Sequence, residues 1–188
     1  DPESVSAQAR AFLRGLRAGG ILSSLKHFPG DGSSWEDSHL GFTDVTDTAN
    51  PEIELRPYRE LITERLADSV MTAHVFNRRL DVEYPATLSR AVLTGLLRER
   101  LGFGGLLITD DMEMGAISKY NEGVDAILAS FIAGADQLLI CHDVTLQEAS
   151  IDAMVRGLES GSIPMRRLEE SFARVVKAKG LIKERPQE

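Results

Sequence analysis

Residues 105–111, Gly105-Leu106-Leu107-Ile108-Thr109-Asp110-Asp111, decide the fold of this chain. A short apolar run between a glycine and two carboxylates is typical of a parallel strand that is buried on both faces. Three further apolar runs have the same character, and they predict strands over residues 20–27, 69–75 and 137–141.

Helical patterns separate these runs. Apolar residues at helical spacing predict a helix over residues 4–18, a second helix that begins at Pro51, and a third that is capped by Ser89. Another pattern starts near Val124, and two more helices close the chain. Strands that alternate with helices predict an α/β fold with a parallel sheet.

Two architectures fit these strands: a flavodoxin-like open sheet and part of a (β/α)8 barrel. In both, ligands bind at the carboxyl ends of the strands. A barrel distributes reactive residues around one mouth, whereas an open sheet usually concentrates them at one switch point. The barrel fits better, because polar residues end every predicted strand, namely Lys26-His27, His74, Asp110-Asp111 and Cys141-His142.

Composition excludes several classes of protein. The chain has 188 residues, a formal net charge of −8, 43% hydrophobic residues and one cysteine. The apolar content excludes a disordered chain, and a single cysteine excludes an internal disulfide. The acidic balance argues against a nucleic-acid partner, and no apolar run reaches the ~20 residues of a membrane span. The single cysteine and the lack of a recognisable signal peptide slightly favour the cytoplasm, but the chain starts at Asp1 rather than methionine, which leaves the compartment open.

Two stretches near the first predicted strand could carry chemistry. Lys26 and His27 could donate hydrogen bonds to the hydroxyls of a polar ligand, and a simple surface turn is the alternative. In Asp37-Ser38-His39 the carboxylate and the imidazole are two residues apart, so Asp37 could orient His39 for proton transfer near neutral pH. A solvated loop histidine beside a carboxylate is the alternative for this triplet.

Later strand ends offer further candidates. Asp110 could be a covalent nucleophile, a metal ligand or a general base, whereas Asp111 is better explained as the cap of a following helix. His74 at a strand end is more often a structural donor than a catalyst, and Cys141 is expected to pack in the interior. The four histidines lack the paired spacings of metal hydrolases, so we expect no metal ion and no other cofactor.

Taken together, these segments resemble glycoside hydrolase family 3, and most of all its β-N-acetylglucosaminidase branch. Each motif alone is weak, but their order and spacing match almost end to end. The matching stretches are Lys26-His27-Phe28-Pro29-Gly30-x-Gly32, Asp37-Ser38-His39, Val70-Met71-Thr72-Ala73-His74, Pro85-Ala86-Thr87-Leu88-Ser89, Leu97-Arg98 with Leu101-Gly102-Phe103-x-Gly105, Ile108-Thr109-Asp110-Asp111-Met112-x-Met114 and Ala133-Gly134-Ala135-Asp136.

The resemblance implies a retaining exo-β-N-acetylglucosaminidase. Asp110 corresponds to the nucleophile, His39 to the acid/base and Asp37 to its partner in a His–Asp dyad. Lys26 and His27 correspond to residues that bind the sugar hydroxyls, and we expect His74 at the same substrate-binding edge. The implied substrate is an N-acetylglucosamine-containing glycan or peptidoglycan fragment. In this branch histidine is frequent at position 31, which is Asp31 here and bears on substrate preference.

The resemblance also implies an incomplete barrel. The chain corresponds to strands five to eight of the family's eight-stranded barrel, so residues 1–188 are expected to form a single partial catalytic domain without an internal linker. Open strand edges then predict self-association or pairing with a missing N-terminal half-barrel. The alternatives are an inactive or weakly sugar-binding half-barrel and a β-glucosidase of the same family. The Asp37-Ser38-His39 triplet argues against the β-glucosidase, because that branch takes its acid/base from a later domain.

Overall fold

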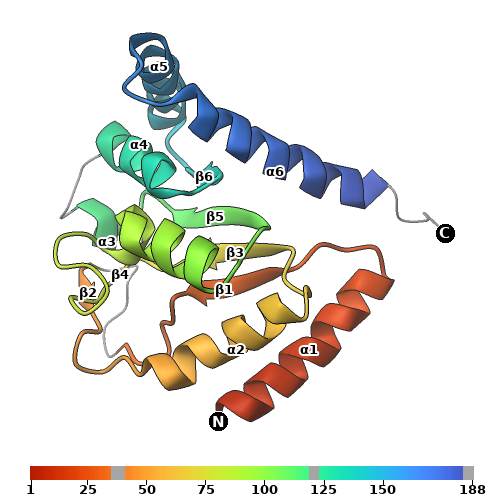
Figure 1. Ribbon diagram of the computed structural model, residues 1–188. Helices are drawn as coiled ribbons and strands as arrows, with labels where there is room; N and C mark the ends of the chain where they lie inside the picture. The colour runs from red at the N-terminus through yellow and green to blue at the C-terminus, as the bar shows by residue number, and fades with distance from the viewer. Residues whose placement is uncertain (35–40, 119–122, 184–188) are drawn as a thin grey trace.

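A four-stranded parallel sheet forms the centre of the computed structural model, which describes residues 1–34, 41–118 and 123–183 (Figure 1). Its strands are β1 (Ser24–Phe28), β3 (Ser69–Thr72), β5 (Leu106–Asp111) and β6 (Gln137–Leu139), and they lie side by side in the order in which they occur in the chain. All three pairings are parallel. This sheet confirms the predicted α/β fold and the strand order of half a (β/α)8 barrel.

Helices connect these strands and flank the sheet (Figure 1). α1 (Pro2–Ala18) and α2 (Pro51–Thr63) pack together near β1, and η2 (Ala91–Arg100), a helix with π-type hydrogen bonds, links β3 to β5. Towards β6 lie α4 (Val124–Ala133), α5 (Val144–Ser160) and α6 (Met165–Lys183). The shorter elements are β2 (Thr43–Asp44), β4 (Val75–Phe76), η1 (Ala86–Leu88) and α3 (Gly115–Ser118). Within the described ranges, no helix is long and apolar enough to cross a membrane.

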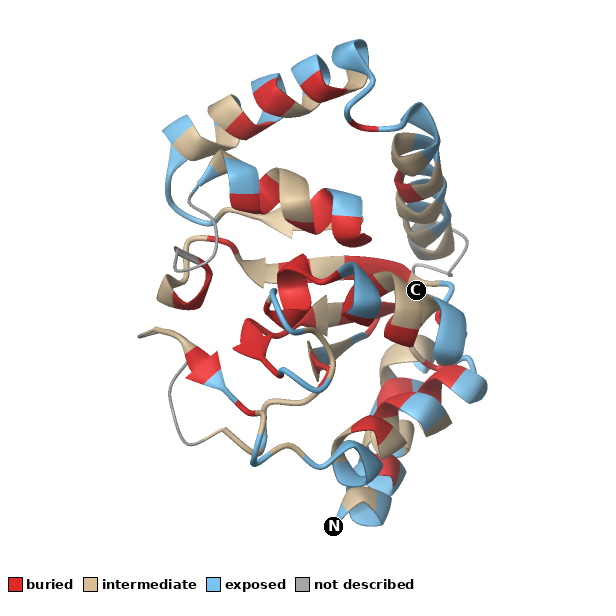
Figure 2. Cartoon of the chain, turned by 60° about the vertical axis from the view of Figure 1, so that its left-hand side comes forward, coloured by how far each residue is buried: buried red, intermediate tan, exposed pale blue. Residues whose placement is uncertain are grey.

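The main hydrophobic core lies on one side of the sheet. Val70 and Leu107 are paired in register on neighbouring strands, and both belong to a buried cluster with Leu93 and Leu97 of η2. Figure 2 shows buried residues concentrated in the central strands and on the helix faces against them. One position further along, the paired residues Met71 and Ile108 are only half-buried, so they face the opposite side of the sheet, which in a closed barrel is the interior.

The strand predicted over residues 69–75 is shorter in the structure, because the chain leaves the main sheet after Thr72. The Ala73 N–H donates to the Phe28 carbonyl at 2.7 Å, and the Ala73 carbonyl accepts from the Thr87 hydroxyl at 2.9 Å. Val75 and Phe76 then form β4, which pairs in parallel with β2 in a separate two-stranded sheet. Side-chain bonding at the strand end therefore replaces further pairing with β5.

Two expectations about individual residues were wrong. Asp111 does not cap a helix, because β5 continues through it and the next helix begins only at Gly115; its carboxylate instead accepts from the backbone N–H groups of Glu113 and Cys141. Cys141 is exposed rather than packed, because β6 ends at Leu139 and the chain has turned outward two residues later.

Asp136 joins three elements through a fully buried carboxylate. Its Oδ2 accepts from the Leu107 N–H at 3.0 Å and from Arg98 at 2.6 Å, while its Oδ1 accepts from Ser171 at 2.7 Å and Arg174 at 3.0 Å. Burial lowers the pKa of Arg98 to about 10, an effect that Asp136 opposes, so the guanidinium stays charged at neutral pH. The carboxylate therefore ties β5, η2 and α6 together.

Apolar cavities lie beside the two edge strands of the sheet, β1 and β6. The cavity beside β1 has a volume of about 520 Å³ and is lined in part by Val5, Leu25 and Ile53. The cavity beside β6 has a volume of about 490 Å³ and is lined in part by Ile151 and Phe172. Val5 is 53% exposed and Phe172 is 67% exposed. Among the strands of the described residues, none pairs with the outer edge of β1 or of β6.

Candidate active site

Asp110 lies near the carboxyl end of β5, with its side chain one quarter exposed. The carboxylate is held on both sides: Oδ1 accepts from the Asp111 N–H at 2.9 Å, and Oδ2 lies 3.5 Å from Nε2 of His27. A central strand supplies a rigid backbone at this position. Asp110 is therefore a fixed, partly exposed carboxylate with an imidazole beside it, which suits a nucleophile.

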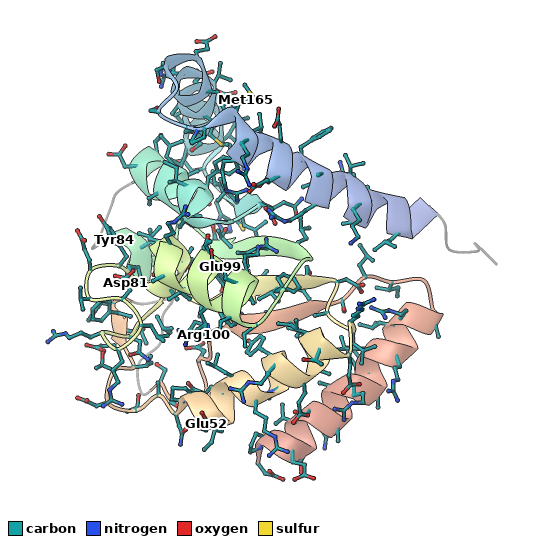
Figure 3. All side chains as sticks on the ribbon, viewed as in Figure 1. Glu52, Asp81, Tyr84, Glu99, Arg100 and Met165 are labelled. Atoms are coloured by element: carbon teal, nitrogen blue, oxygen red, sulfur yellow. The ribbon has the colours of Figure 1, made fainter. Side chains whose placement is uncertain are left out.

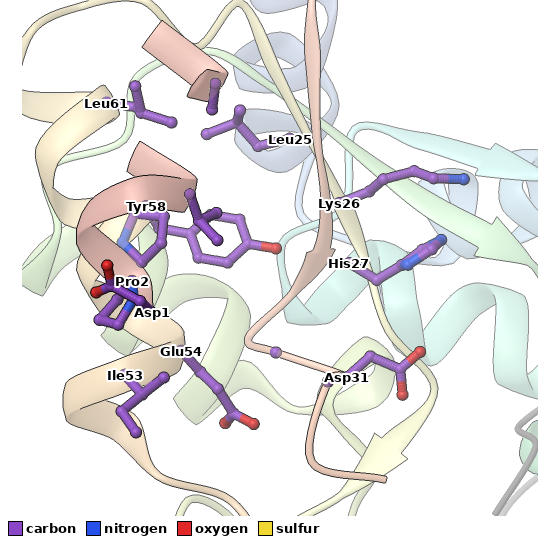
Figure 4. Close-up of a pocket in the computed structure, with 15 residues that line it drawn as sticks. Asp1, Pro2, Leu25, Lys26, His27, Asp31, Ile53, Glu54, Tyr58 and Leu61 are labelled. Carbon is purple, nitrogen blue, oxygen red and sulfur yellow. The ribbon is translucent and has the colours of Figure 1, made fainter. Parts of the chain in front are cut away.

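Lys26 and His27 are adjacent in β1, yet both side chains leave the strand on the side opposite to Leu25 and Tyr58 (Figure 4). In a regular strand, neighbouring side chains alternate between the two faces. Here the pairing of β1 with β3 is irregular between Leu25 and Phe28, and such a register shift redirects side chains. Lys26 and His27 therefore leave β1 on the same side, and there Nε2 of His27 lies 3.5 Å from Oδ2 of Asp110.

His74 lies deeper, with only 2% of its surface exposed. Its Nδ1 lies 2.7 Å from the Thr87 hydroxyl, and its Nε2 lies 2.9 Å from the backbone carbonyl of Asp111. The Thr87 hydroxyl also lies 2.8 Å from that of Thr72. A carbonyl can only accept, so Nε2 carries a hydrogen. The Thr87 hydroxyl has one hydrogen and lies within bonding distance of both Nδ1 of His74 and the Ala73 carbonyl, so it donates to one of them at a time.

The surroundings of His74 favour the neutral ring. Burial lowers the pKa of His74, and the bond to Asp111 and the charges of Asp110 and Asp111 only partly oppose this effect. Both ring nitrogens already have partners within the protein, which leaves none for a sugar hydroxyl. This placement favours a positioning role for His74, at the backbone next to Asp110, over the sugar contact expected from the sequence.

The loop that carries Thr87 is itself well anchored. Asp81 accepts from the backbone N–H groups of Glu83 and Tyr84, and from the Ser89 hydroxyl at 2.5 Å (Figure 3). Ser89 in turn accepts from the Val92 N–H at the start of η2. Neither Thr87 nor Thr72 was predicted as a site residue from the sequence, although Thr87 lies in a stretch that matched the family pattern. The position of a hydroxyl residue between apolar residues is the sequence signal from which Thr87 could have been predicted.

We expect the stability of the protein to depend on pH through His74. Because the pKa of His74 is lowered in the fold, the unfolded chain takes up the proton first as pH falls below about 6.5. The contribution of His74 to stability is therefore present above that pH and lost below it. Calorimetric melting between about pH 7.5 and pH 5.5 should show a larger fall in Tm for the native chain than for His74→Asn. Parallel Tm profiles for the two proteins would contradict a neutral, buried His74.

Asp37 and His39 lie outside the described residues. The segment that leads to them is anchored at Gly30, whose φ of +140° is unfavourable for any other residue, and where an added Cβ would collide with the side chain of Glu54. The Ser33 hydroxyl also donates to Glu54. The loop therefore departs from a defined point beside α2, close to Asp31, which lines the cavity near β1. The roles of Asp37 and His39 stay predictions.

Comparisons with known proteins point in one direction. Residues 1–178 match the family described as the glycosyl hydrolase family 3 N-terminal domain. The β-hexosaminidase LpqI of Mycobacterium bovis is 38% identical over 191 residues, which cover 96% of this chain and 47% of that protein. β-Hexosaminidase A of Pseudoalteromonas piscicida is 33% identical over 199 residues, which cover 95% of this chain and 33% of that protein. The chain therefore spans between a third and a half of these curated relatives.

Solved structures agree with this match. A glycoside hydrolase family 3 β-N-acetylglucosaminidase from a Paenibacillus species superposes with a TM-score of 0.86 at 38% identity, covering 94% of this chain and 34% of its own. A β-glucoside phosphorylase, BglX, superposes with a TM-score of 0.87 at 32% identity, covering 100% of this chain and 36% of its own. The fold is therefore shared with proteins about two to three times longer.

Proposed function

Because this chain belongs to glycoside hydrolase family 3, we propose that it is the catalytic half of a retaining exo-β-N-acetylglucosaminidase. The observation that carries the proposal is the Asp110 carboxylate at the end of β5, held by the Asp111 N–H and facing His27 across 3.5 Å. The curated relatives named β-hexosaminidase favour the N-acetylated sugar.

In the first step, an Asp110 oxygen attacks the anomeric carbon of a terminal β-linked N-acetylglucosamine. The bond from that carbon to the leaving oxygen breaks as His39 donates its proton to the oxygen. Asp37 stabilises the His39 imidazolium that exists before this transfer and fixes its orientation. The product of this step is a glycosyl ester on Asp110, with inverted configuration at the anomeric carbon.

In the second step, neutral His39 accepts a proton from water while the water oxygen attacks the anomeric carbon. The bond to Asp110 breaks, the carboxylate is restored, and the sugar leaves with its original configuration. Lys26 and His27 hold sugar hydroxyls on the face that carries Asp110. His74 contributes by holding the Asp111 carbonyl, and with it the backbone next to Asp110.

We further propose that the sugar site and the sheet are completed by a second half-barrel, supplied either by another copy of this chain or by an N-terminal half. The cavities beside β1 and β6 support this proposal. Exposed apolar side chains such as Val5, Ile53 and Phe172 border both ends of the sheet, and their burial against partner strands would stabilise the assembly. Open parallel edges favour such pairing.

The direct test is hydrolysis of p-nitrophenyl β-N-acetylglucosaminide by the purified chain, assayed across gel-filtration fractions that separate monomer from larger species. We expect p-nitrophenol release in the fractions of the larger species. The p-nitrophenyl β-glucoside should react much more slowly, and comparable rates on the two substrates would instead support a β-glucosidase. Absence of turnover in all fractions, together with no heat of binding for N-acetylglucosamine, would support an inactive half-barrel.

The similarity to a β-glucoside phosphorylase calls for a second assay with inorganic phosphate, because phosphate could replace water in the second step. Assays with and without inorganic phosphate distinguish the two acceptors. We expect free N-acetylglucosamine in both. Formation of the sugar 1-phosphate as the main product would identify a phosphorylase that uses the same glycosyl-enzyme.

A further inference from the structure

Three metal-ligating side chains meet where β5 and β6 end, next to the candidate active site but separate from Lys26, His27 and Asp110. Asp111, Glu113 and His142 each offer one ligand atom, and these atoms all lie within 4.8 Å of one another. Nδ1 of His142 lies 3.7 Å from Oδ2 of Asp111 and 3.6 Å from Oε2 of Glu113.

The two carboxylates are held in place by backbone donors. Oδ1 of Asp111 accepts from the N–H groups of Glu113 and Cys141, which leaves Oδ2 facing His142. Glu113 accepts from the N–H groups of His142 and Asp143 at 2.6 and 3.1 Å. Both carboxylates are about four-fifths buried, whereas His142 is 82% exposed. Two ligands are therefore preorganised, and the third is an accessible side chain that can adjust.

We propose that Asp111, Glu113 and His142 bind a divalent transition-metal ion, with Zn²⁺ as the best match. Zn²⁺ holds oxygen and nitrogen ligands at about 2.0–2.2 Å in a tetrahedral arrangement, which places neighbouring ligand atoms about 3.4 Å apart. The imidazole nitrogen lies 3.6 and 3.7 Å from the two carboxylate oxygens, and all three ligand atoms lie within 4.8 Å of one another, so the ligands would close inward around the ion. Two carboxylates balance the charge of the ion, and the fourth position is open to water.

The ligand set also predicts selectivity. An imidazole nitrogen suits zinc and its neighbours in the first transition row, whereas Mg²⁺ and Ca²⁺ prefer oxygen ligands alone. Cys141 lies beside the cluster, but the ligand atoms that converge belong to Asp111, Glu113 and His142, so Cys141 is not one of the proposed ligands.

Binding would connect β5 to the segment between β6 and α5, one residue beyond Asp110. The ion should stabilise this edge whether or not the chain turns over a glycoside. The proposal is therefore independent of the proposed glycosidase activity, and its test does not need a substrate. The site could not be predicted from a short sequence motif, because the imidazole comes from the end of one strand and the carboxylates come from the end of another.

The test is isothermal titration of the chelator-treated chain with zinc chloride, together with thermal melting in zinc chloride or magnesium chloride. We expect one bound Zn²⁺ per chain and a higher Tm with zinc, but no Tm change with the same concentration of magnesium. His142→Gln and Asp111→Asn should each weaken binding by at least about tenfold, the lower limit of losses from altered outer-shell partners. His142 is exposed, so its replacement should leave the fold of the metal-free chain intact.

Two control variants locate the ion. Cys141→Ser and His27→Gln should retain zinc affinity within about twofold. Loss of binding in Cys141→Ser would assign the ion to the lone thiol, and loss in His27→Gln would assign it to the His27–Asp110 pair; either result overturns the proposal. No zinc binding by the native chain, or unchanged affinity in His142→Gln, overturns it as well.

Discussion

Replacement of Asp110 by asparagine is expected to lower turnover of an aryl β-N-acetylglucosaminide by more than about three orders of magnitude. The amide is a poor nucleophile and carries no charge to stabilise the developing positive charge on the sugar. Its Oδ1 can still accept from the Asp111 N–H, so the end of β5 should keep its conformation and the Tm should change little. Steady-state rates and calorimetric melting of the native and Asp110→Asn chains measure both effects.

Two further measurements separate the nucleophile from a merely structural carboxylate. A 5-fluoro N-acetylglucosaminyl fluoride should add one sugar mass to the native chain, on the peptide that contains Asp110, and none to Asp110→Asn. Asp47→Asn makes the same chemical change at an exposed carboxylate and should leave turnover unchanged. Turnover that survives Asp110→Asn, or a label on another carboxylate, would refute the assignment.

Replacement of Asp136 by asparagine is expected to destabilise the protein by about 3–5 kcal/mol. Asp136 is fully buried and pairs with Arg98, Arg167 and Arg174, and it also accepts from the Leu107 backbone. The amide leaves these three guanidinium groups without a counter-charge. Removal of one partner from a buried ion pair is costly because the remaining charge cannot be solvated. Urea unfolding followed by circular dichroism measures the loss.

The exposed pair between Arg79 and Asp47 provides the matched control, because the Asp47 side chain is 93% exposed. Solvent screens such a pair, so Asp47→Asn should shift the urea midpoint little. Similar shifts for Asp136→Asn and Asp47→Asn would show that the Asp136 cluster does not hold α6 on the sheet.

Much of the fold followed from periodicity. The strand that contains Leu107 was predictable because a continuous apolar run marks it, although the face with Ile108 is only half-buried, and helical spacing identified α1 and α5. The ends of elements were less predictable. His74 and Cys141 were expected inside strands, but side-chain bonds at Ala73 and the end of β6 at Leu139 took both residues out of the sheet.

The candidate site also has one part that was predictable from the sequence and one part that was not. Residue type and order alone singled out Lys26, His27 and Asp110, because strand ends of a parallel sheet share one edge. The buried Thr72–Thr87–His74 network, in contrast, depends on hydroxyls that approach one another within 3 Å from separate segments. Distances of that kind are set by packing, on which the spacing of residues in the chain has little influence.

The amino-acid sequence by itself determined the parallel α/β architecture, the strand order and the family, because the hydrophobic periodicity and the order of the motifs can be recognised in the sequence alone. Only the tertiary structure decided that the His74 ring bonds to Thr87 and to the Asp111 carbonyl, that the buried Asp136 carboxylate pairs with arginines, and that Asp111, Glu113 and His142 converge. The reason is that burial and charge pairing depend on contacts between segments that are far apart in the sequence, and these contacts form only when the chain packs.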